Sequence, residues 1–284
     1  LINLTNRFPV VLKRGAVLIH DAHVFDLSST YKPIFGSSYR SLYRLAVTRG
    51  LDLVTVSNFS RGRLSQALRV NPDRWTVIQN GIDHILETEA DFSVLERFGL
   101  VPETYVLSAG GRARHKNLAA LKLLGRGLAA KGYVLVAVGD ISPKVYAGTE
   151  MDEGLKYVGQ MDDGELRALF ENARCFVFPS LYEGFGLPPL EAMALGCPVA
   201  TSDIAPLREA CGKACIFFDP EDPEDIAERV MALSNDEAQR LLLGNAGREV
   251  TRNLTWDRSA QKWLDLLFVA SKSSRVLWSN SHST

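Results

Sequence analysis

Residues 175–194 read Cys-Phe-Val-Phe-Pro-Ser-Leu-Tyr-Glu-Gly-Phe-Gly-Leu-Pro-Pro-Leu-Glu-Ala-Met-Ala. The apolar run at the start predicts a buried strand, and Pro189 marks the start of a helix, because proline is favoured in the first helical turn. Gly184 and Gly186 lie in the turn between them. A strand, a glycine turn and a helix form an anion site, since the first helical turn has N–H groups without internal partners.

Two carboxylates flank this turn, Glu183 on one side and Glu191 on the other. Carboxylates do not bind phosphate, but they accept hydrogen bonds from hydroxyl groups. An anion site between two hydroxyl-binding groups matches the chemistry of a nucleotide-sugar. The same spacing also fits a plain strand-to-helix turn with two solvated glutamates, because a spacing alone is a weak motif.

The string from Glu183 to Met193 resembles the signature of family 4 retaining glycosyltransferases. The resemblance implies an α/β fold of the GT-B type, in which two Rossmann-like parallel-sheet domains face a cleft. It implies that Glu191 holds the ribose hydroxyls and that Glu183 lies beside the hydroxyls of the donor sugar as a catalytic residue. The other residues of the turn that it assigns to donor binding are Gly184, Phe185, Gly186 and Leu187.

A second glycine turn follows the apolar run 105–107 and continues into a cationic stretch, Arg112-Ala113-Arg114-His115-Lys116. Positive side chains before a helix predict a second anion site, although an exposed basic turn has the same pattern. The turn resembles the family's diphosphate loop, with Lys116 as the catalytic cation and His115 where arginine is usual. We therefore expect Arg112 or Arg114 to supply the second cation. The donor-binding residues expected here are Gly110, Gly111, Arg112, Arg114 and Lys116.

His20 and Asp21 follow the apolar run 16–19. Open parallel sheets bind ligands at the carboxyl ends of their strands, and histidine can exchange a proton near neutral pH. A histidine satisfied by loop carbonyls is the simpler alternative. Because the segment resembles the family's strand that ends in His-Asp, we expect His20 at the reacting sugar.

Short apolar runs alternate with helical stretches along the whole chain, as in parallel α/β proteins. The second half has enough strands for a complete Rossmann-like domain and the first half has about half that number, so we expect an incomplete first domain. The runs before residue 100 are 16–19, 53–56 and 75–78, and those after it are 105–107, 134–138, 155–158, 175–178, 198–200 and 214–218.

These patterns predict the domain organisation. Residues 1–98 form a partial amino-terminal domain that binds the acceptor, with a linker near 87–91, and residues 99–255 form the nucleotide-sugar domain. An apolar helical face over 256–270 predicts a terminal helix, which in GT-B proteins crosses back to the first domain. The serine-rich residues 271–284 are expected to be a disordered tail.

Composition excludes several classes of protein. The 284 residues carry a net charge of −1, and we find no apolar run long enough to span a membrane and no leader pattern, so we expect a cytoplasmic chain. All four cysteines lie in the second half and lack the spacing of a metal site, which predicts buried free thiols. We expect no metal and no cofactor.

Basic residues are concentrated between Tyr31 and Trp75, with eight Lys or Arg against two acids. Positive charge interleaved with aromatic residues is typical of a surface that contacts an anionic membrane or a lipid diphosphate, and also of a plain solvated face. Nucleic acid is not expected as a partner, because no recognition motif accompanies the charge.

The resemblance implies a retaining hexosyltransferase, similar to mannosyltransferases, that moves a sugar from a nucleotide-diphospho-sugar to an acceptor hydroxyl. The expected acceptor is a glycan or lipid-linked glycan in cell-surface polysaccharide synthesis, at the cytoplasm or the inner face of the membrane. Two alternatives remain: a nucleotide-sugar epimerase on the same fold, and a non-catalytic fragment that binds a nucleotide-sugar.

Overall fold

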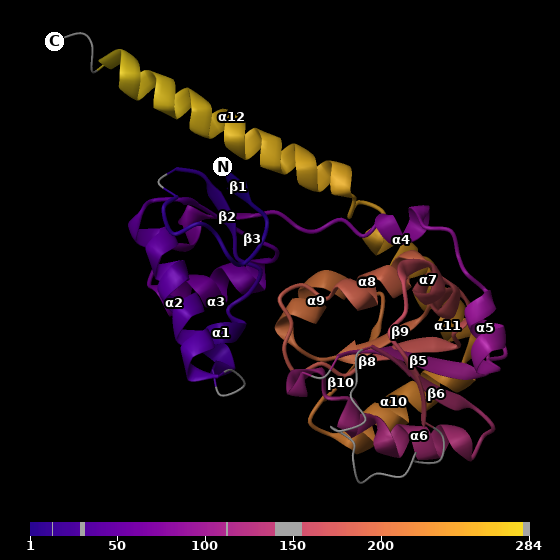
Figure 1. The fold of residues 1–284 in the computed structure, drawn as a ribbon. Helices are drawn as coiled ribbons and strands as arrows, with labels where there is room; N and C mark the ends of the chain where they lie inside the picture. Colours follow the sequence, from indigo (N-terminus) through magenta and orange to yellow (C-terminus); the bar gives the residue numbers. More distant parts are fainter. Residues whose placement is uncertain (13, 29–31, 112, 140–154, 281–284) are drawn as a thin grey trace.

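The computed structural model describes residues 1–12, 14–28, 32–111, 113–139 and 155–280, the last twelve of them by their backbone alone. These residues form two α/β domains joined by a linker, and a long helix leaves the second domain (Figure 1). The loop after the strand Val134–Val138 lies outside the described residues.

The first domain contains a four-stranded parallel sheet in the order β1-β2-β3-β4. In register, Val17 pairs with Leu53, and Val54 pairs with Thr76. Its elements are β1 Ile2–Asn3, β2 Ala16–Leu18, α1 His23–Asp26, α2 Pro33–Thr48, β3 Asp52–Thr55, α3 Asn58–Leu68, the 3-10 turn η2 Pro72–Arg74 and β4 Trp75–Val77. The sequence pattern missed β1, because two residues are too few to show a periodicity.

The second domain contains a six-stranded parallel sheet in the order β10-β9-β8-β5-β6-β7. Helices cover both faces, with α7, α8 and α9 on one side and α6 and α10 on the other (Figure 1). Its elements are α4 His84–Glu87, α5 Ser93–Phe98, β5 Tyr105–Ala109, η3 Arg114–Lys116, η4 Leu118–Leu121, α6 Lys122–Ala129, β6 Val134–Val138, β7 Leu155–Gly159, α7 Asp163–Asn172, β8 Cys175–Phe178, α8 Leu187–Ala194, β9 Val199–Ser202, α9 Ala205–Cys211, β10 Ile216–Phe218, α10 Pro223–Asn235 and α11 Glu237–Thr251.

Local sequence explains where these helices begin. Ser57 accepts a hydrogen bond from the backbone N–H of Ser60 and caps α3. Asp162 and Glu165 form a reciprocal capping box at the start of α7. All nine strands predicted from apolar runs are confirmed, with ends that differ by one or two residues.

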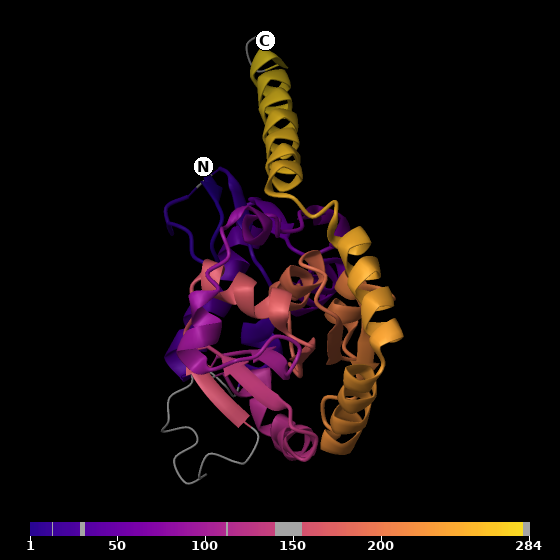
Figure 2. The same ribbon diagram turned by 90° about the vertical axis from the view of Figure 1, so that its right-hand side faces the viewer.

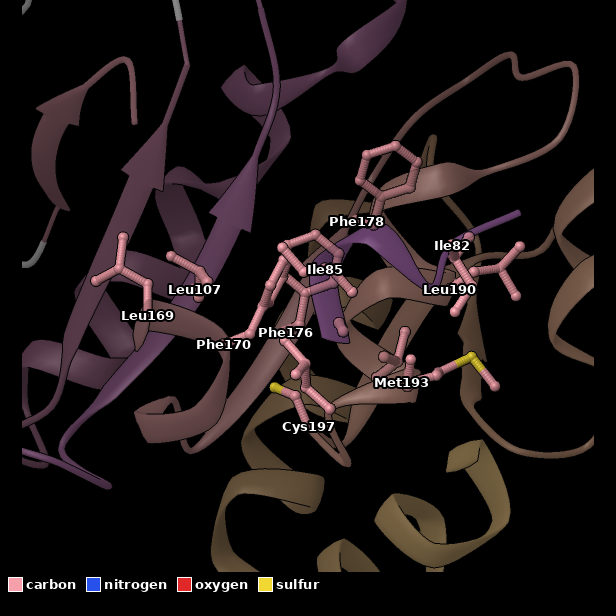
Figure 3. Packing of buried hydrophobic residues seen from close by; sticks show 14 of the residues in the cluster. Ile82, Ile85, Leu107, Leu169, Phe170, Phe176, Phe178, Leu190, Met193 and Cys197 are labelled. Atoms are coloured by element: carbon pink, nitrogen blue, oxygen red, sulfur yellow. The ribbon is translucent and has the colours of Figure 1, made fainter. Parts of the chain in front are cut away.

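The largest buried cluster extends across both domains. It joins Leu18 and Val54 of the first sheet to Phe176 and Leu190 of the second domain. Figure 3 shows the part of this cluster around Phe176, including Ile85 from α4. Burial on this scale is the main favourable term in folding. The cysteines are free and buried, as predicted.

The predicted domain boundary lies too late in the chain. Helices α4 and α5 belong to the predicted first domain, but both pack against α7 of the second. The reason is that their apolar residues, Ile85 and Val94, join the cluster around the second sheet.

The terminal helix, α12 Trp256–Asn280, leaves the second domain and passes over the first (Figure 1). Trp263 and Leu266 pack against the cluster shared by the two domains. The helix continues through residues 271–280, where we expected a disordered tail, because the segment contains no glycine or proline to end it. Figure 2 shows its far end rising away from both domains. Within the described residues, no helix combines the length and apolar character that a membrane crossing needs.

Candidate active site between the two domains

The glycine turn between β8 and α8 has the backbone geometry that its sequence predicts. Gly186 has a φ of +98°, and a Cβ atom there would lie 2.5 Å from Cδ2 of Leu207. Gly184 faces the other domain, and a Cβ atom there would lie 2.9 Å from Cβ of Asp21. Both positions therefore require glycine, the first for its backbone conformation and the second for the close approach of the two domains.

Residues of the first domain hold this turn in place. Ser57 Oγ donates a 2.6 Å hydrogen bond to the carbonyl oxygen of Gly184, and Ser60 Oγ donates one of 3.2 Å. In the opposite direction, the carboxylate of Glu209 in α9 accepts hydrogen bonds from the backbone N–H groups of Asn58 and Phe59. The start of α3 and the glycine turn therefore form one polar contact between the domains.

Lys116 and Glu183 form an ion pair, with 2.6 Å between Nζ and Oε1. Both side chains are largely buried, and the Lys116 ammonium lies 5.3 Å from the centre of the Phe178 ring. The carbonyl oxygen of His115 accepts hydrogen bonds from Leu181 N and Ser180 Oγ, which ties the cationic turn to the glycine turn. The two predicted anion loops therefore meet at this ion pair.

A histidine pair links the domains beside Lys116. Nε2 of His23, from α1, lies 3.2 Å from Nδ1 of His115. Burial lowers the pKa of His115 to about 4, and the positive charge of Lys116 contributes. Burial also lowers the pKa of His23. Both imidazoles are therefore neutral at pH 7, and one donates to the other.

These residues line a cavity of about 320 Å³. The second domain contributes His115, Lys116, Glu183 and Gly184, and the first contributes His23, together with three aromatic side chains. Those aromatic residues are Phe35, Tyr39 and Tyr43 of α2. A cation, a carboxylate and aromatic rings in one cavity can bind a phosphorylated sugar, the cation facing the phosphate and the carboxylate facing hydroxyls.

His20 is not among the residues that line this cavity. Its imidazole forms a hydrogen bond with the backbone of Leu4, and burial lowers its pKa. Its backbone N–H donates to Asn6 Oδ1. Of the two histidines, the structure places His23 in the cavity. The sequence signal for His23 is its position three residues after His20, shortly after the same strand.

Glu191 is also absent from the lining of this cavity. Its carboxylate is buried in α8, and Oε1 lies 3.3 Å from Nε2 of His84 in α4. Burial raises the pKa of Glu191, and the interaction with His84 opposes this shift.

The other residues that were predicted to bind the donor lie in the turns and the core around the cavity, where the structure describes them. Gly110 lies against the backbone of Gly139, where a Cβ atom would be 2.0 Å from the Gly110 carbonyl oxygen. Phe185 is 5% exposed and packs in the shared cluster. Gly111 follows Gly110 in the turn, Leu187 begins α8, Arg114 is exposed, and Arg112 lies outside the described residues. The residue that lines the cavity next to Lys116 is His115, and Arg114 is not among the lining residues.

Comparison with known proteins places these features in a family. The model of the family "Glycosyl transferases group 1" matches residues 97–250. The O-antigen chain mannosyltransferase B of Escherichia coli is 31% identical over 270 residues, which cover 88% of this chain and 68% of that protein. The O-antigen chain mannosyltransferase RfbU of Salmonella typhimurium is 25% identical and covers 75% of this chain, but the chain spans only 58% of RfbU.

Solved structures share the architecture. Sucrose-phosphate synthase from Thermosynechococcus elongatus superimposes with a TM-score of 0.72 at 20% identity, covering 90% of this chain and 68% of its own. Anabaena HepE, solved in complex with UDP-glucose, gives a TM-score of 0.71 at 18% identity, covering 89% and 72%. These likenesses show the GT-B fold predicted from the sequence. The chain belongs to the glycosyl transferases group 1 family.

Proposed function

We propose that this protein is a retaining hexosyltransferase that moves a sugar from a nucleotide-diphospho-sugar to an acceptor hydroxyl in cell-surface polysaccharide synthesis. The observation that carries the proposal is the Lys116–Glu183 ion pair, which lies beside the glycine turn in the cavity between the domains. The names of the two O-antigen mannosyltransferases favour mannose as the sugar and a glycan or lipid-linked glycan as the acceptor.

The main barrier in this reaction is the negative charge that grows on the departing diphosphate. Lys116 can release Glu183 and turn to a phosphate, because both groups border the same cavity. The backbone N–H groups of Gly186 and Leu187, at the start of α8, add the positive end of the helix dipole, whereas Pro188 and Pro189 have no N–H to offer. Preorganised cations and amides of this kind act in the transition state, so we propose that no metal ion or other cofactor is needed.

Glu183 has a second role in this proposal. Once Lys116 faces the diphosphate, the Glu183 carboxylate can accept hydrogen bonds from the hydroxyls of the donor sugar. The acceptor enters from the side of α2, where Phe35 and Tyr39 provide flat surfaces for a sugar ring. Its hydroxyl oxygen then bonds to the anomeric carbon on the face that the diphosphate leaves, and the hydroxyl proton passes to the departing phosphate oxygen, which retains the configuration of the anomeric carbon.

Calorimetric titration with GDP, UDP, dTDP and ADP tests the donor site. We expect saturable binding of one nucleotide, and a Lys116→Ala variant that binds it at least about tenfold more weakly, or about 1.4 kcal/mol. Arg114→Ala is the matched control, because this neighbouring cation is exposed and lies outside the cavity. A folded chain that binds none of the four nucleotides would refute the donor site.

Turnover assays separate the alternatives. A transferase consumes donor only when an acceptor is present, and NMR of the product shows whether the anomeric configuration is retained. An epimerase consumes donor without an acceptor, and a non-catalytic fragment binds it without turnover. Activity that persists in excess EDTA is the expected result for a reaction without a metal ion.

We also propose that the start of α2 contacts an anionic membrane surface at the inner face. Ile34 is 85% exposed, and the cation two residues before it, Lys32, is also exposed. Fewer basic side chains can contact a membrane than the sequence indicated, because two of them have partners within the domain. Arg40 donates a hydrogen bond to the carbonyl oxygen of Val24, and Arg63 forms an ion pair with Asp26. Co-sedimentation with phosphatidylglycerol vesicles but not with phosphatidylcholine vesicles is the expected result, and equal binding to both would refute the contact.

A further inference from the structure

Glu191 is a buried acid whose partner comes from a different helix of the second domain. The Glu191 side chain is 11% exposed, and the group that meets its carboxylate is His84 of the short helix α4, just after the connection from the first domain. On the far side of that imidazole, Nε1 of Trp256 donates a 3.4 Å hydrogen bond to Nδ1. The three side chains therefore form a row that runs from the first residue of α12 to the middle of α8.

The order of donors in this row determines the tautomer of His84. An indole N–H can only donate, so Nδ1 of His84 must be the acceptor and carries no proton. In a neutral imidazole the proton then lies on Nε2, which is the nitrogen that faces Glu191. His84 can therefore donate a hydrogen bond to the carboxylate without becoming charged.

The surroundings of Glu191 show why this donor matters. Burial disfavours a carboxylate, and the nearby acid Asp163 adds repulsion, so both effects raise the pKa of Glu191. The charge interaction with His84 and the hydrogen bond from His84 both act in the opposite direction and lower the pKa of Glu191. Without His84, a buried carboxylate would lose a compensating donor, which favours protonation or a turn of the side chain.

The backbone around His84 is fixed by the same part of α12. The N–H of Trp256 donates to Oδ1 of Asp83 at 2.8 Å, and the N–H of Ile82 donates to the carbonyl oxygen of Leu254 at 2.9 Å. A Cβ atom at Gly81 would lie 2.3 Å from the Trp256 nitrogen, so the two chain segments are in direct contact. These backbone contacts therefore hold the side chains of His84 and Trp256 next to each other.

We propose that His84, held by Trp256, is a positioning residue that keeps the carboxylate of Glu191 ionised and oriented to accept hydroxyl groups of the nucleotide-sugar. His84 meets Oε1, and a carboxylate has a second oxygen that can accept from a ribose hydroxyl at the same time. The inference rests on the proposed function, because it takes Glu191 as the hydroxyl-binding group. It connects the linker and α12 to the donor site through one row of hydrogen bonds.

The first test does not depend on any substrate. NMR of the nitrogen-15-labelled chain reports the tautomer of each histidine, and we expect His84 to be protonated at Nε2 and not at Nδ1. The Trp256→Phe variant keeps a ring but removes the indole N–H, so it should show a mixture of tautomers. A wild-type His84 protonated at Nδ1 would overturn the proposal.

The second test compares nucleotide affinity in matched variants. His84→Ala should weaken binding of the preferred nucleotide about tenfold, whereas His84→Gln should stay within about threefold, because its amide nitrogen can donate where Nε2 did. Leu86→Ala, an exposed residue of the same helix, is the control for damage to α4. Equal affinities of folded wild type and His84→Ala would overturn the proposal.

The two arms separate this inference from the proposed function. If the wild type binds no nucleotide, the donor site fails, and titration of Glu191 by carbon-13 NMR decides the role of His84. A higher pKa of Glu191 in His84→Ala than in wild type supports the inference, and an unchanged pKa refutes it.

Discussion

The two sides of the cavity are built in different ways. On the side of the second domain, Lys116 and Glu183 lie in turns that directly follow β5 and β8, two neighbouring strands of a six-stranded sheet. On the side of the first domain, the aromatic residues of the cavity lie on the long helix α2, beside a four-stranded sheet of short strands. Functional residues that follow a strand within a few positions can be found from a sequence pattern, whereas residues spread along a helix can be assigned to the cavity only from the fold.

The difference is also visible in the two glycines of the turn. Gly186 is crowded by Leu207 of its own domain, whereas Gly184 is crowded by Asp21 of the other. Gly186 is therefore required by the packing within the second domain, and Gly184 is required by the close contact between the two domains. Substitutions at the two positions should affect different measurements.

The largest effect is expected in the core of the second domain, beneath its side of the cavity. Phe176→Ala removes a fully buried ring of β8, which should lower the free energy of unfolding by about 3–5 kcal/mol. Leu53→Ala in the first sheet is the counterpart, with an expected loss of about 2–5 kcal/mol. Urea denaturation measures both. A loss below about 1 kcal/mol for Phe176→Ala would contradict the central place of this sheet in the fold.

Catalysis should depend on the Lys116–Glu183 ion pair of the second domain. Lys116→Ala should reduce kcat by about 10²–10³-fold, or about 2.7–4 kcal/mol, because the charge on the leaving diphosphate loses its cation. Arg114→Ala should leave kcat nearly unchanged, since Arg114 is exposed. Steady-state kinetics with the preferred donor compare the two, and equal losses would show that the cationic turn acts as a general basic patch.

The glycine pair tests the division between the two sides. Gly186→Ala forces an alanine to a φ of +98° and a clash with Leu207, which should destabilise the protein by about 1–3 kcal/mol. Gly184→Ala should change stability less but lower kcat/KM, because its methyl group separates the domains at Asp21. Thermal unfolding and kinetics on both variants measure the contrast. A reversed pattern would show that the domains do not need this approach during turnover.

The contact between the sides should depend modestly on Glu209. Glu209→Gln removes the negative charge that faces the first N–H groups of α3, and caps of this kind contribute about 1 kcal/mol. Small-angle scattering should show a slightly more open molecule, and a shift of the unfolding midpoint should accompany it. An unchanged profile together with unchanged stability would mean that the Ser57 contact alone holds the turn.

The smallest effect at neutral pH is expected from the histidine pair, because its contribution to stability changes only under acidic conditions. The pKa of His115 is about 4 in the folded protein and 6.5 ordinarily, so the unfolded chain binds more protons between these values. Stability should therefore decrease as pH falls from about 6.5 to about 4, and this contribution should be constant above 6.5. His115→Gln should flatten part of this dependence in urea titrations at several pH values. A slope as steep as that of wild type would contradict the shift.

Local patterns predicted the strands and the turns because each signal lies within a few residues. The run of four apolar residues at Cys175–Phe178 and the glycines after it needed no tertiary information. The family resemblance then added roles for Lys116 and Glu183, and the structure brings these two together at 2.6 Å. Their catalytic roles stay predictions until kinetics test them.

Other features depend on contacts between distant residues. Ser57 contacts Gly184, 127 positions later in the chain, and His23 meets His115, 92 positions later, so no local pattern could indicate either pair. The boundary was placed too late because α4 and α5 follow the first sheet in sequence but pack on the second. The orientation of His20 likewise depends on a hydrogen bond with the backbone of Leu4, which lies directly after β1.

The chain passes between the domains twice, and the two passages run side by side where Ile82 N meets Leu254 O. Two parallel connections define a rotation axis, whereas a single connection would leave the domains free to twist as well as to bend. We therefore expect the domains to open and close about a line near Gly81 and Trp256 rather than to twist. Such a movement would return Ser57 to Gly184 in the same orientation each time the domains close.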